Sequence, residues 1–358
     1  VEMDPEQKTV TVADQNRTYQ ENYDKLILSP GAQPIVPPMK GLHQEKVFAL
    51  RNIPDTVRIK EFVKQQSPKR AVVIGGGYIG VEMAENLAQA GVEVTIVEMA
   101  DHVIAPLDLD MACDVHLHLQ AKGVKLALGR QVTAIETKGE QLRFVLDSGI
   151  LEADMGVLCV GVKPDTAFCR KAGLLCNGRG SIMVDEHMRT NLKDIYAVGD
   201  AVEITNFVTG NKGFIPLAGP ANRQGRIAAD NICGIPSRYM GSQGSSILKV
   251  FDLTVASTGV NEKTAKEEGF SFDKMFTYSP SHAGYYPGSV PMSVKVIYEK
   301  ATGKILGAQI VGGEGVDKRC DVLAVAIRAG MTAFDLTQLE LCYAPPYSSA
   351  KDPVNMAG

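Results

Sequence analysis

A short apolar strand that runs into a glycine-rich turn constrains this chain more than any other feature. Val72-Val73-Ile74 leads directly into Gly75-Gly76-Gly77-Tyr78-Ile79-Gly80, and a helix-like stretch and a second strand follow. In dinucleotide-binding units the first glycine allows the tight turn, the next lets the backbone approach a pyrophosphate, and the last lets the helix pack on the sheet. We assign these roles to Gly75, Gly77 and Gly80. The phosphates would bind the free N–H groups of the helix that starts near Tyr78.

Glu98 completes this unit at the end of the second strand. It follows Val94-Thr95-Ile96-Val97, close to the roughly 20-residue spacing expected for the acid that binds the ribose hydroxyls. A carboxylate accepts hydrogen bonds from both hydroxyls but repels a 2′-phosphate, and no Arg follows before Arg130. We therefore expect Glu98 to favour NADH over NADPH. The competing interpretation is an exposed acid at a strand end.

Size, charge and cysteine usage bound the class of protein. The 358 residues allow two or three domains, and a net charge of −4 without a basic cluster disfavours nucleic acid or an anionic membrane as a partner. Apolar runs such as 155–162 are too short to span a bilayer. Seven cysteines without a CxxC pair favour reduced thiols in the cytoplasm. No metal site is expected, because His116 and His118 would point to different faces of one helix.

Secondary-structure patterns divide the first two thirds of the chain. A β-hairpin is expected from 9–12 and 23–28, followed by a proline-rich extended connector at 34–38. The βαβ unit and its continuation occupy 69 to about 165. There we predict a helix near 109–122, strands at 131–137 and 141–146, and a buried strand at 155–160.

A second nucleotide site is indicated near residue 200. An apolar strand ends in Gly199-Asp200, which places a carboxylate at the carboxyl edge of a parallel sheet. Because the first unit already uses Glu98, Asp200 implies another site, although it would also suit a helix N-cap. The simplest arrangement is two Rossmann-like domains, with 69–189 inserted in the other and a helix near 221–232 closing it. From residue 245, alternating strands and a helix near 316–328 predict a third, α+β domain.

These features together resemble the flavin-dependent pyridine nucleotide–disulfide oxidoreductase family. The resemblance covers essentially the whole chain. Its final segments are most similar to the coenzyme A-disulfide reductases and their NADH-oxidase-like relatives. The stretches that carry the family resemblance are Ser29-Pro30-Gly31-Ala32, Gly75–Gly80, Gly161 within Cys159–Pro164, Gly199-Asp200 and Pro216–Arg226, and those that carry the subgroup resemblance are His282–Pro287 and Tyr343 through Pro353.

The resemblance implies an α/β fold of two Rossmann-like domains, for FAD and NAD, and a C-terminal α+β dimerisation domain. Parts of the FAD-binding domain would lie at 1–68 and 190–244, the NAD(P)H-binding domain at 69–189 and the dimerisation domain at 245–358. The family's N-terminal GxGxxG motif and its redox-active cysteine are absent from this sequence. We therefore expect a missing N-terminal segment and an inactive fragment, so the function below belongs to the intact polypeptide.

Cofactor roles follow from the resemblance. Asp200 would hold a ribitol hydroxyl of FAD through a charge-assisted hydrogen bond. Backbone groups around Leu217 and Ala218 would line the isoalloxazine edge. Glu82 would approach the nicotinamide, with Tyr78 as the gate over the flavin or, on sequence alone, as ordinary packing. The cofactor-binding set is Gly75, Gly76, Gly77, Tyr78, Ile79, Gly80, Glu82, Glu98, Gly161, Gly199, Asp200, Leu217, Ala218 and Tyr343.

Substrate roles also follow from the resemblance. Arg223 and Lys351 would bind coenzyme A phosphates, a task to which the planar guanidinium of arginine is suited. Tyr285 and Tyr343 would polarise a leaving thiolate, whereas the competing interpretation is aromatic packing at a subunit interface. We expect Tyr285, Tyr343 and Lys351 to act in trans with Arg223 and the missing cysteine of the other subunit.

The intact protein is thus interpreted as a cytoplasmic homodimer that takes hydride from NADH or NADPH. Electrons would pass through FAD to a cysteine thiolate that cleaves a coenzyme A disulfide or persulfide by thiol–disulfide exchange. An NADH oxidase or peroxidase of the same family is the alternative. A flavin-less NADH-binding sensor is a hypothesis from a different class.

Overall fold

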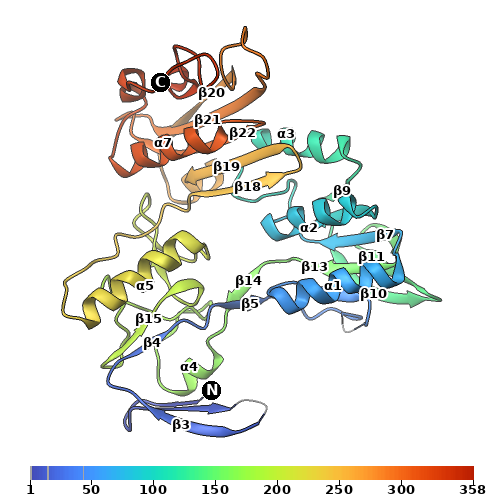
Figure 1. The fold of residues 1–358 in the computed structure, drawn as a ribbon, viewed down its shortest axis with the longest axis vertical. Coiled ribbons are helices and arrows are strands. Elements are labelled where there is room, and N and C mark those ends of the chain that lie inside the picture. The colour runs from blue at the N-terminus through green and yellow to red at the C-terminus, as the bar shows by residue number, and fades with distance from the viewer. Residues whose placement is uncertain (1, 14–15, 43) are drawn as a thin grey trace. The chain divides into compact units, whose positions relative to one another are not determined.

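The computed structural model describes residues 2–13, 16–42 and 44–358, which Figure 1 traces from blue to red. These residues form two compact units, Val1–Gln33 with Val162–Gly244 and Pro34–Gly161 with Ser245–Gly358. The first unit is therefore built from two stretches that are separated in the sequence by an inserted segment. This agrees with the expected insertion of one nucleotide domain in another.

The inserted segment has other bounds than the predicted 69–189. Strand β6 (Val47–Ala49) pairs in parallel with β13 (Met155–Leu158), and Phe48 packs in the same core as Ile59 of α1 (Ile53–Gln66). Residues from Pro34 onward therefore belong with the parallel sheet that contains β6 and β13. At the other end, Ile182 and Met188 are buried in the core of the first unit. Single short strands carry no sequence signal of their partner, so these boundaries emerge only in the structure.

A five-stranded parallel sheet in the order β6-β13-β7-β8-β9 carries the glycine-rich turn. Successive residues of its central strand face opposite sides, so both faces are buried. Val73 packs with the helices, whereas Val72 and Ile74 pack with the antiparallel sheet β10-β11-β12. The elements are β7 (Arg70–Ile74), α2 (Tyr78–Gln89), β8 (Glu93–Glu98), α3 (Leu109–Ala121), β9 (Lys125–Leu128), β10 (Val132–Lys138), β11 (Gln141–Leu146) and β12 (Gly149–Ala153).

The predicted hairpin near the N-terminus is wrong in its second strand. Strand β2 (Thr9–Ala13) pairs with β3 (Thr18–Asn22), while β4 (Leu26–Leu28) pairs in parallel with β15 (Ile195–Ala197). The reason is burial, because β15 lies in the core of this unit and Leu26 and Leu28 of β4 pack there. The unit also contains β1 (Glu2–Asp4), β5 (Ala32–Pro34), β14 (Val162–Pro164), α4 (Ala167–Lys171), the 3-10 helix η1 (Gly199–Ala201), β16 (Ile204–Thr205), β17 (Lys212–Gly213) and α5 (Ala218–Ile232).

The C-terminal part of the second unit is an antiparallel sheet in the order β18-β19-β22-β21-β20. Its strand β22 is buried along its whole length, and α7 packs against β19 and β22. In the described ranges no helix has the length and hydropathy needed to cross a membrane. The elements are β18 (Ser246–Val250), β19 (Leu253–Gly259), α6 (Glu262–Glu267), β20 (Phe272–Pro280), β21 (Pro291–Glu299), β22 (Ile305–Gly312), α7 (Val316–Arg328), the 3-10 helix η2 (Phe334–Gln338) and α8 (Pro353–Ala357).

Candidate functional site

The glycine-rich turn has the geometry that its sequence predicted. Gly75 has φ +106°, and a Cβ there would lie 2.4 Å from the carbonyl oxygen of Cys159. A Cβ on Gly80 would lie 1.9 Å from the carbonyl oxygen of Gly75, so both positions require glycine. At Gly77 a Cβ would meet nothing within 4 Å, and no side chain caps the helix that begins there. The free N–H groups of α2 therefore border open space, which suits an approaching pyrophosphate.

Glu98 is held in place by the same turn. Its Oε2 accepts a hydrogen bond from the Gly76 N–H at 2.6 Å, and its Oε1 accepts one from the Ala100 N–H at 2.8 Å. Each carboxylate oxygen keeps a further lone pair for a hydroxyl donor. The side chain is therefore an oriented carboxylate beside the turn rather than a freely rotating acid at a strand end.

The loop after Glu98 packs on the turn through contacts that the sequence did not reveal. The Ile104 N–H donates to the Gly76 carbonyl at 2.8 Å, and the Val103 N–H donates to Nε2 of His116 at 3.2 Å. Ile104 has φ +59°, an uncommon conformation for a β-branched residue. His116 therefore anchors a strained loop, whereas its neighbour His118 lies 3.3 Å from Asp252 instead. No local sequence pattern indicates such a role for a histidine.

Acidification is expected to weaken the fold through His116. Burial, with a smaller contribution from His102, lowers the pKa of His116 below its ordinary value near 6.5. At a pH between the lowered pKa of the folded protein and the ordinary pKa of the unfolded chain, the unfolded chain binds more protons than the folded protein. The free energy of unfolding therefore falls as the pH drops from 6.5 through the folded-state pKa of His116. Urea unfolding at several pH values should show this loss in the wild type and a smaller one in His116→Gln, which keeps a neutral acceptor. Equal pH dependence of the two proteins would contradict the assignment.

Tyr78 is tied to the start of the C-terminal sheet. Its phenol oxygen lies 2.6 Å from the hydroxyl oxygen of Ser246, and burial raises the pKa of the Tyr78 phenol. The neighbouring Ile79 is partly buried and packs against the core that includes α2 and β8. The ring of Tyr78 thus has a fixed anchor, and its role as a gate over a flavin stays a prediction.

Glu82 and Gly161 occupy the other predicted cofactor positions of this unit. Glu82 is exposed on α2, and the pKa of its carboxyl is raised mainly by desolvation and further by the nearby Glu85. Gly161 has φ +96°, and its carbonyl accepts a hydrogen bond from the Ile35 N–H at 2.9 Å. Gly161 therefore serves the turn that follows β13, and a direct cofactor contact for either residue stays a prediction.

The second predicted nucleotide site lies in the first unit, where β15 is followed by η1. Asp200 sits in that 3-10 helix, directly after Gly199 with φ +78°. The Gly199 N–H donates to Oε1 of Gln224 at 2.7 Å, and Gln224 on α5 is only 1% exposed. Leu217 is the N-cap of α5 and Ala218 its first residue, again without a side-chain cap. This role of Gln224 was not predicted from the sequence, although the residue lies inside the stretch 216–226 that carries the resemblance.

The structure brings together two of the four predicted catalytic or substrate residues. The phenol oxygens of Tyr285 and Tyr343 lie 3.1 Å apart although the residues are separated by 58 positions. Their side chains are 77% and 49% exposed, and their mutual hydrogen bond raises the pKa of Tyr285. Lys351 is exposed in the same unit, whereas Arg223 is exposed on α5 of the other.

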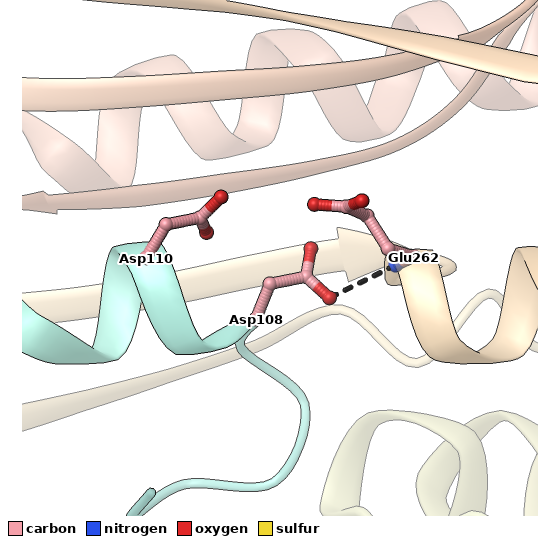
Figure 2. Close-up of side chains that lie close together, drawn as sticks. All are labelled: Asp108, Asp110 and Glu262. Atoms are coloured by element: carbon pink, nitrogen blue, oxygen red, sulfur yellow. Dashed lines mark hydrogen bonds between the residues drawn. The ribbon is translucent and has the colours of Figure 1, made fainter.

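Three carboxylates that the sequence did not connect converge between α3 and α6 (Figure 2). Asp108 and Asp110 come from the start of α3, and Glu262 from the start of α6. The ammonium of Lys295, fully buried, lies 2.8 Å from each aspartate and 2.5 Å from Glu262. A lysine charge therefore takes the position that a metal ion would need. We interpret the cluster as an ion-pair network that joins α3, α6 and β21.

The cysteines divide by burial. All seven are free, and burial raises the pKa of the thiols of Cys159, Cys169 and Cys320 to about 12. Since the thiolate is the reactive form, these three are inert near neutral pH.

Comparisons with known proteins agree with these features. The family model described as "Pyridine nucleotide-disulphide oxidoreductase" matches residues 1–225, and that of the family's dimerisation domain matches 245–353. The chain is 34% identical over 359 residues to an NADH oxidase of Methanocaldococcus jannaschii, covering all of this chain and 80% of that protein. It is also 34% identical over 362 residues to a coenzyme A disulfide reductase of Staphylococcus epidermidis, covering all of this chain and 81% of the relative.

A solved structure is also similar over the whole chain. The crystal structure of reduced Bacillus anthracis CoADR-RHD superposes with a TM-score of 0.97 at 50% identity. All of the present chain is covered, and it spans 65% of the length of that solved chain. With the glycine-rich turn, the anchored Glu98 and the C-terminal antiparallel sheet in place, these matches show that the chain belongs to the pyridine nucleotide-disulphide oxidoreductase family.

Proposed function

We propose that the intact polypeptide is an FAD-dependent NAD(P)H oxidoreductase that reduces coenzyme A disulfide or persulfide. The observation that carries the acceptor class is the pair of phenols of Tyr285 and Tyr343 on exposed loops, 3.1 Å apart. Two adjacent hydroxyl groups can donate hydrogen bonds to a departing thiolate and stabilise its developing charge. Neither residue has another role evident in the folding of the core.

The nucleotide part of the proposal depends on the turn between β7 and α2. The open space at Gly77 and the uncapped α2 would take the pyrophosphate, and the oriented Glu98 carboxylate would accept from the ribose hydroxyls. In the first unit, Asp200 and the uncapped start of α5 would hold FAD. A bound flavin would supply two-electron transfer from the nicotinamide. The protein's own contribution is to bind and orient both groups.

The substrate part requires cations against the phosphates of coenzyme A. Lys351 and Arg223 are exposed and supply them in different units. We propose a homodimer in which Lys351 and the tyrosine pair of one subunit complete the site of the other. Support comes from the match of residues 245–353 to the family's dimerisation domain.

The test is anaerobic NADH oxidation by the full-length protein with coenzyme A disulfide as the acceptor. We expect turnover, and Lys351→Ala should raise KM for the disulfide about ten- to a hundredfold, since one charged contact contributes on the order of 1.5–3 kcal/mol. Reduction of the flavin by NADH should stay intact in this variant. Turnover that needs O₂ and ignores the disulfide would favour an NADH oxidase instead, the activity named for the M. jannaschii relative.

Substitution of Glu98 tests the coenzyme preference. Glu98→Arg in the full-length enzyme should raise kcat/KM for NADPH relative to NADH by about tenfold or more, because a guanidinium pairs with the 2′-phosphate that a carboxylate repels. The matched control is Glu98→Gln, which removes the charge but keeps an acceptor for the Gly76 or Ala100 N–H. It should lose NADH efficiency without gaining NADPH selectivity. An unchanged ratio in the arginine variant would show that Glu98 does not contact the ribose.

A further inference from the structure

We infer that Arg319 is a positioning residue that sets the geometry of the Tyr285–Tyr343 pair. The inference deepens the proposed function and rests on it. Two loops carry the pair: residues 281–290, here called the first tyrosine loop, and residues 341–352, the second tyrosine loop. Their tips are exposed, whereas their bases meet at one buried guanidinium.

Arg319 lies on α7 and is 1% exposed. In the first tyrosine loop its Nη2 donates to the carbonyl of Ser281 at 3.0 Å. In the second loop the same nitrogen donates to the hydroxyl of Ser348 at 3.3 Å and to the carboxylate of Asp352 at 2.9 Å. Nε adds a contact to Asp352 at 3.1 Å. One planar group therefore binds both loops.

The second tyrosine loop offers this guanidinium a prepared partner. Asp352 is 2% exposed, and its carboxylate also accepts from the Ser348 hydroxyl at 2.6 Å and from the Val354 N–H at 3.0 Å. The two loops are joined directly as well, because the Ala283 N–H donates to the carbonyl of Ser348 at 3.1 Å. The first tyrosine loop can therefore not shift without disturbing the second.

The helix start makes room for this arrangement. Gly315 precedes α7 with φ +71°, and its carbonyl accepts from Nη1 of Arg319 at 3.1 Å. A Cβ on Gly315 would lie 2.0 Å from that nitrogen. The guanidinium thus has protein partners on each of its nitrogens and none of its charge faces solvent.

The buried pair of Arg319 and Asp352 contributes more to the positions of the two loops than to the stability of the fold. Buried ion pairs are often no more stabilising than well-packed apolar side chains, because desolvation offsets the attraction. The planar fork of arginine does fix direction, and lysine does not reproduce it. The hydrogen bond between the two exposed phenols depends on both loops, so its length is set at the base, where Arg319 lies. Misplacement of reacting groups by about 1 Å can cost about a hundredfold in rate.

The test is a double-mutant cycle in the full-length enzyme with coenzyme A disulfide as the acceptor. Arg319→Lys should lower kcat about ten- to a hundredfold while reduction of the flavin by NADH stays within about twofold. In a Tyr285→Phe background, Arg319→Lys should lower kcat only slightly further, because the tyrosine pair that Arg319 positions is already broken. If Arg319→Lys lowers kcat by the same factor in the wild type and in Tyr285→Phe, the inference is overturned and Arg319 is a purely structural residue. Ser348→Ala, a milder change at the same junction, replaces Arg319→Lys in the cycle if the latter does not fold.

Two further measurements distinguish a failure of the positioning role from a failure of the proposed function. Lys318→Gln is the matched control, since Nζ of Lys318 lies 3.7 Å from Oδ2 of Asp352, too far for a hydrogen bond, and its side chain is 37% exposed. It should leave kcat within about twofold. Alkaline titration of phenolate absorbance needs no acceptor: loss of the pair in Arg319→Lys should let Tyr285 ionise at lower pH, as in Tyr343→Phe. If the protein does not reduce the disulfide yet this titration shifts as stated, the proposed function fails and the positioning role stands. An unshifted titration contradicts the positioning role itself.

Discussion

Replacement of Lys295 by Met is expected to lower the free energy of unfolding by about 3–5 kcal/mol, the usual cost of removing one partner from a buried ion-pair network. The ammonium of Lys295 is fully buried and touches Asp108, Asp110 and Glu262. Without it, three carboxylates would face one another, with Lys274 close to Asp110 and Glu262. Urea unfolding of the purified full-length protein measures the loss. The loss should shrink as the pH falls from 4.5 through the folded pKa of Glu262, because burial raises that pKa but the contacts with Lys274 and Lys295 lower it further, to a net value below 4.5.

Lys274→Met is the matched control for this prediction. Lys274 contacts Glu262 of the same cluster, but its side chain is 35% exposed. Such partly solvated pairs contribute about 1 kcal/mol or less, so the control should remain close to the wild type. A chelator should leave the stability of the wild type unchanged, because the ammonium of Lys295 already lies against all three carboxylates. Equal losses in the two lysine variants would show that burial of Lys295 is not what makes it important.

Two alanine substitutions in the glycine-rich turn are expected to separate folding from nucleotide binding. Gly80→Ala places a methyl group where the Gly75 carbonyl oxygen lies only 1.9 Å away, and backbone cannot yield as a flexible side chain would. We expect a loss of about 3 kcal/mol in the free energy of unfolding, at the upper end for overpacking, together with loss of NADH binding.

Gly77→Ala should behave in the opposite way. Its methyl group meets nothing within 4 Å of the protein, so stability should change by about 1 kcal/mol at most. It points into the space that the pyrophosphate would occupy, and NADH affinity should therefore fall at least about tenfold, equivalent to 1.4 kcal/mol. Thermal unfolding and NADH titration of both variants decide the matter. If Gly77→Ala binds NADH normally, the dinucleotide does not cross the turn at this residue.

Local sequence patterns determined much of the fold. The glycines at 75 and 80 are steric requirements of the turn itself, and the structure shows the clashes that any side chain would cause. The helices α3 and α7 and the strand β11 follow from side-chain periodicity, and they lie where the sequence predicted them. These features depend on residues a few positions apart. For that reason a single sequence is sufficient to predict them.

Contacts between distant segments were decided by the tertiary structure alone. Lys295 meets Asp110 across 185 positions, and Arg319 meets Asp352 across 33. Neither lysine nor arginine carries a local signal that it will be buried, since both are usually exposed. The sequence named Tyr285 and Tyr343 separately by resemblance, but their hydrogen bond forms where two loops that are distant in the sequence meet, both in contact with Arg319. Burial and partner choice depend on how the strands and helices pack, and local periodicity does not specify that packing.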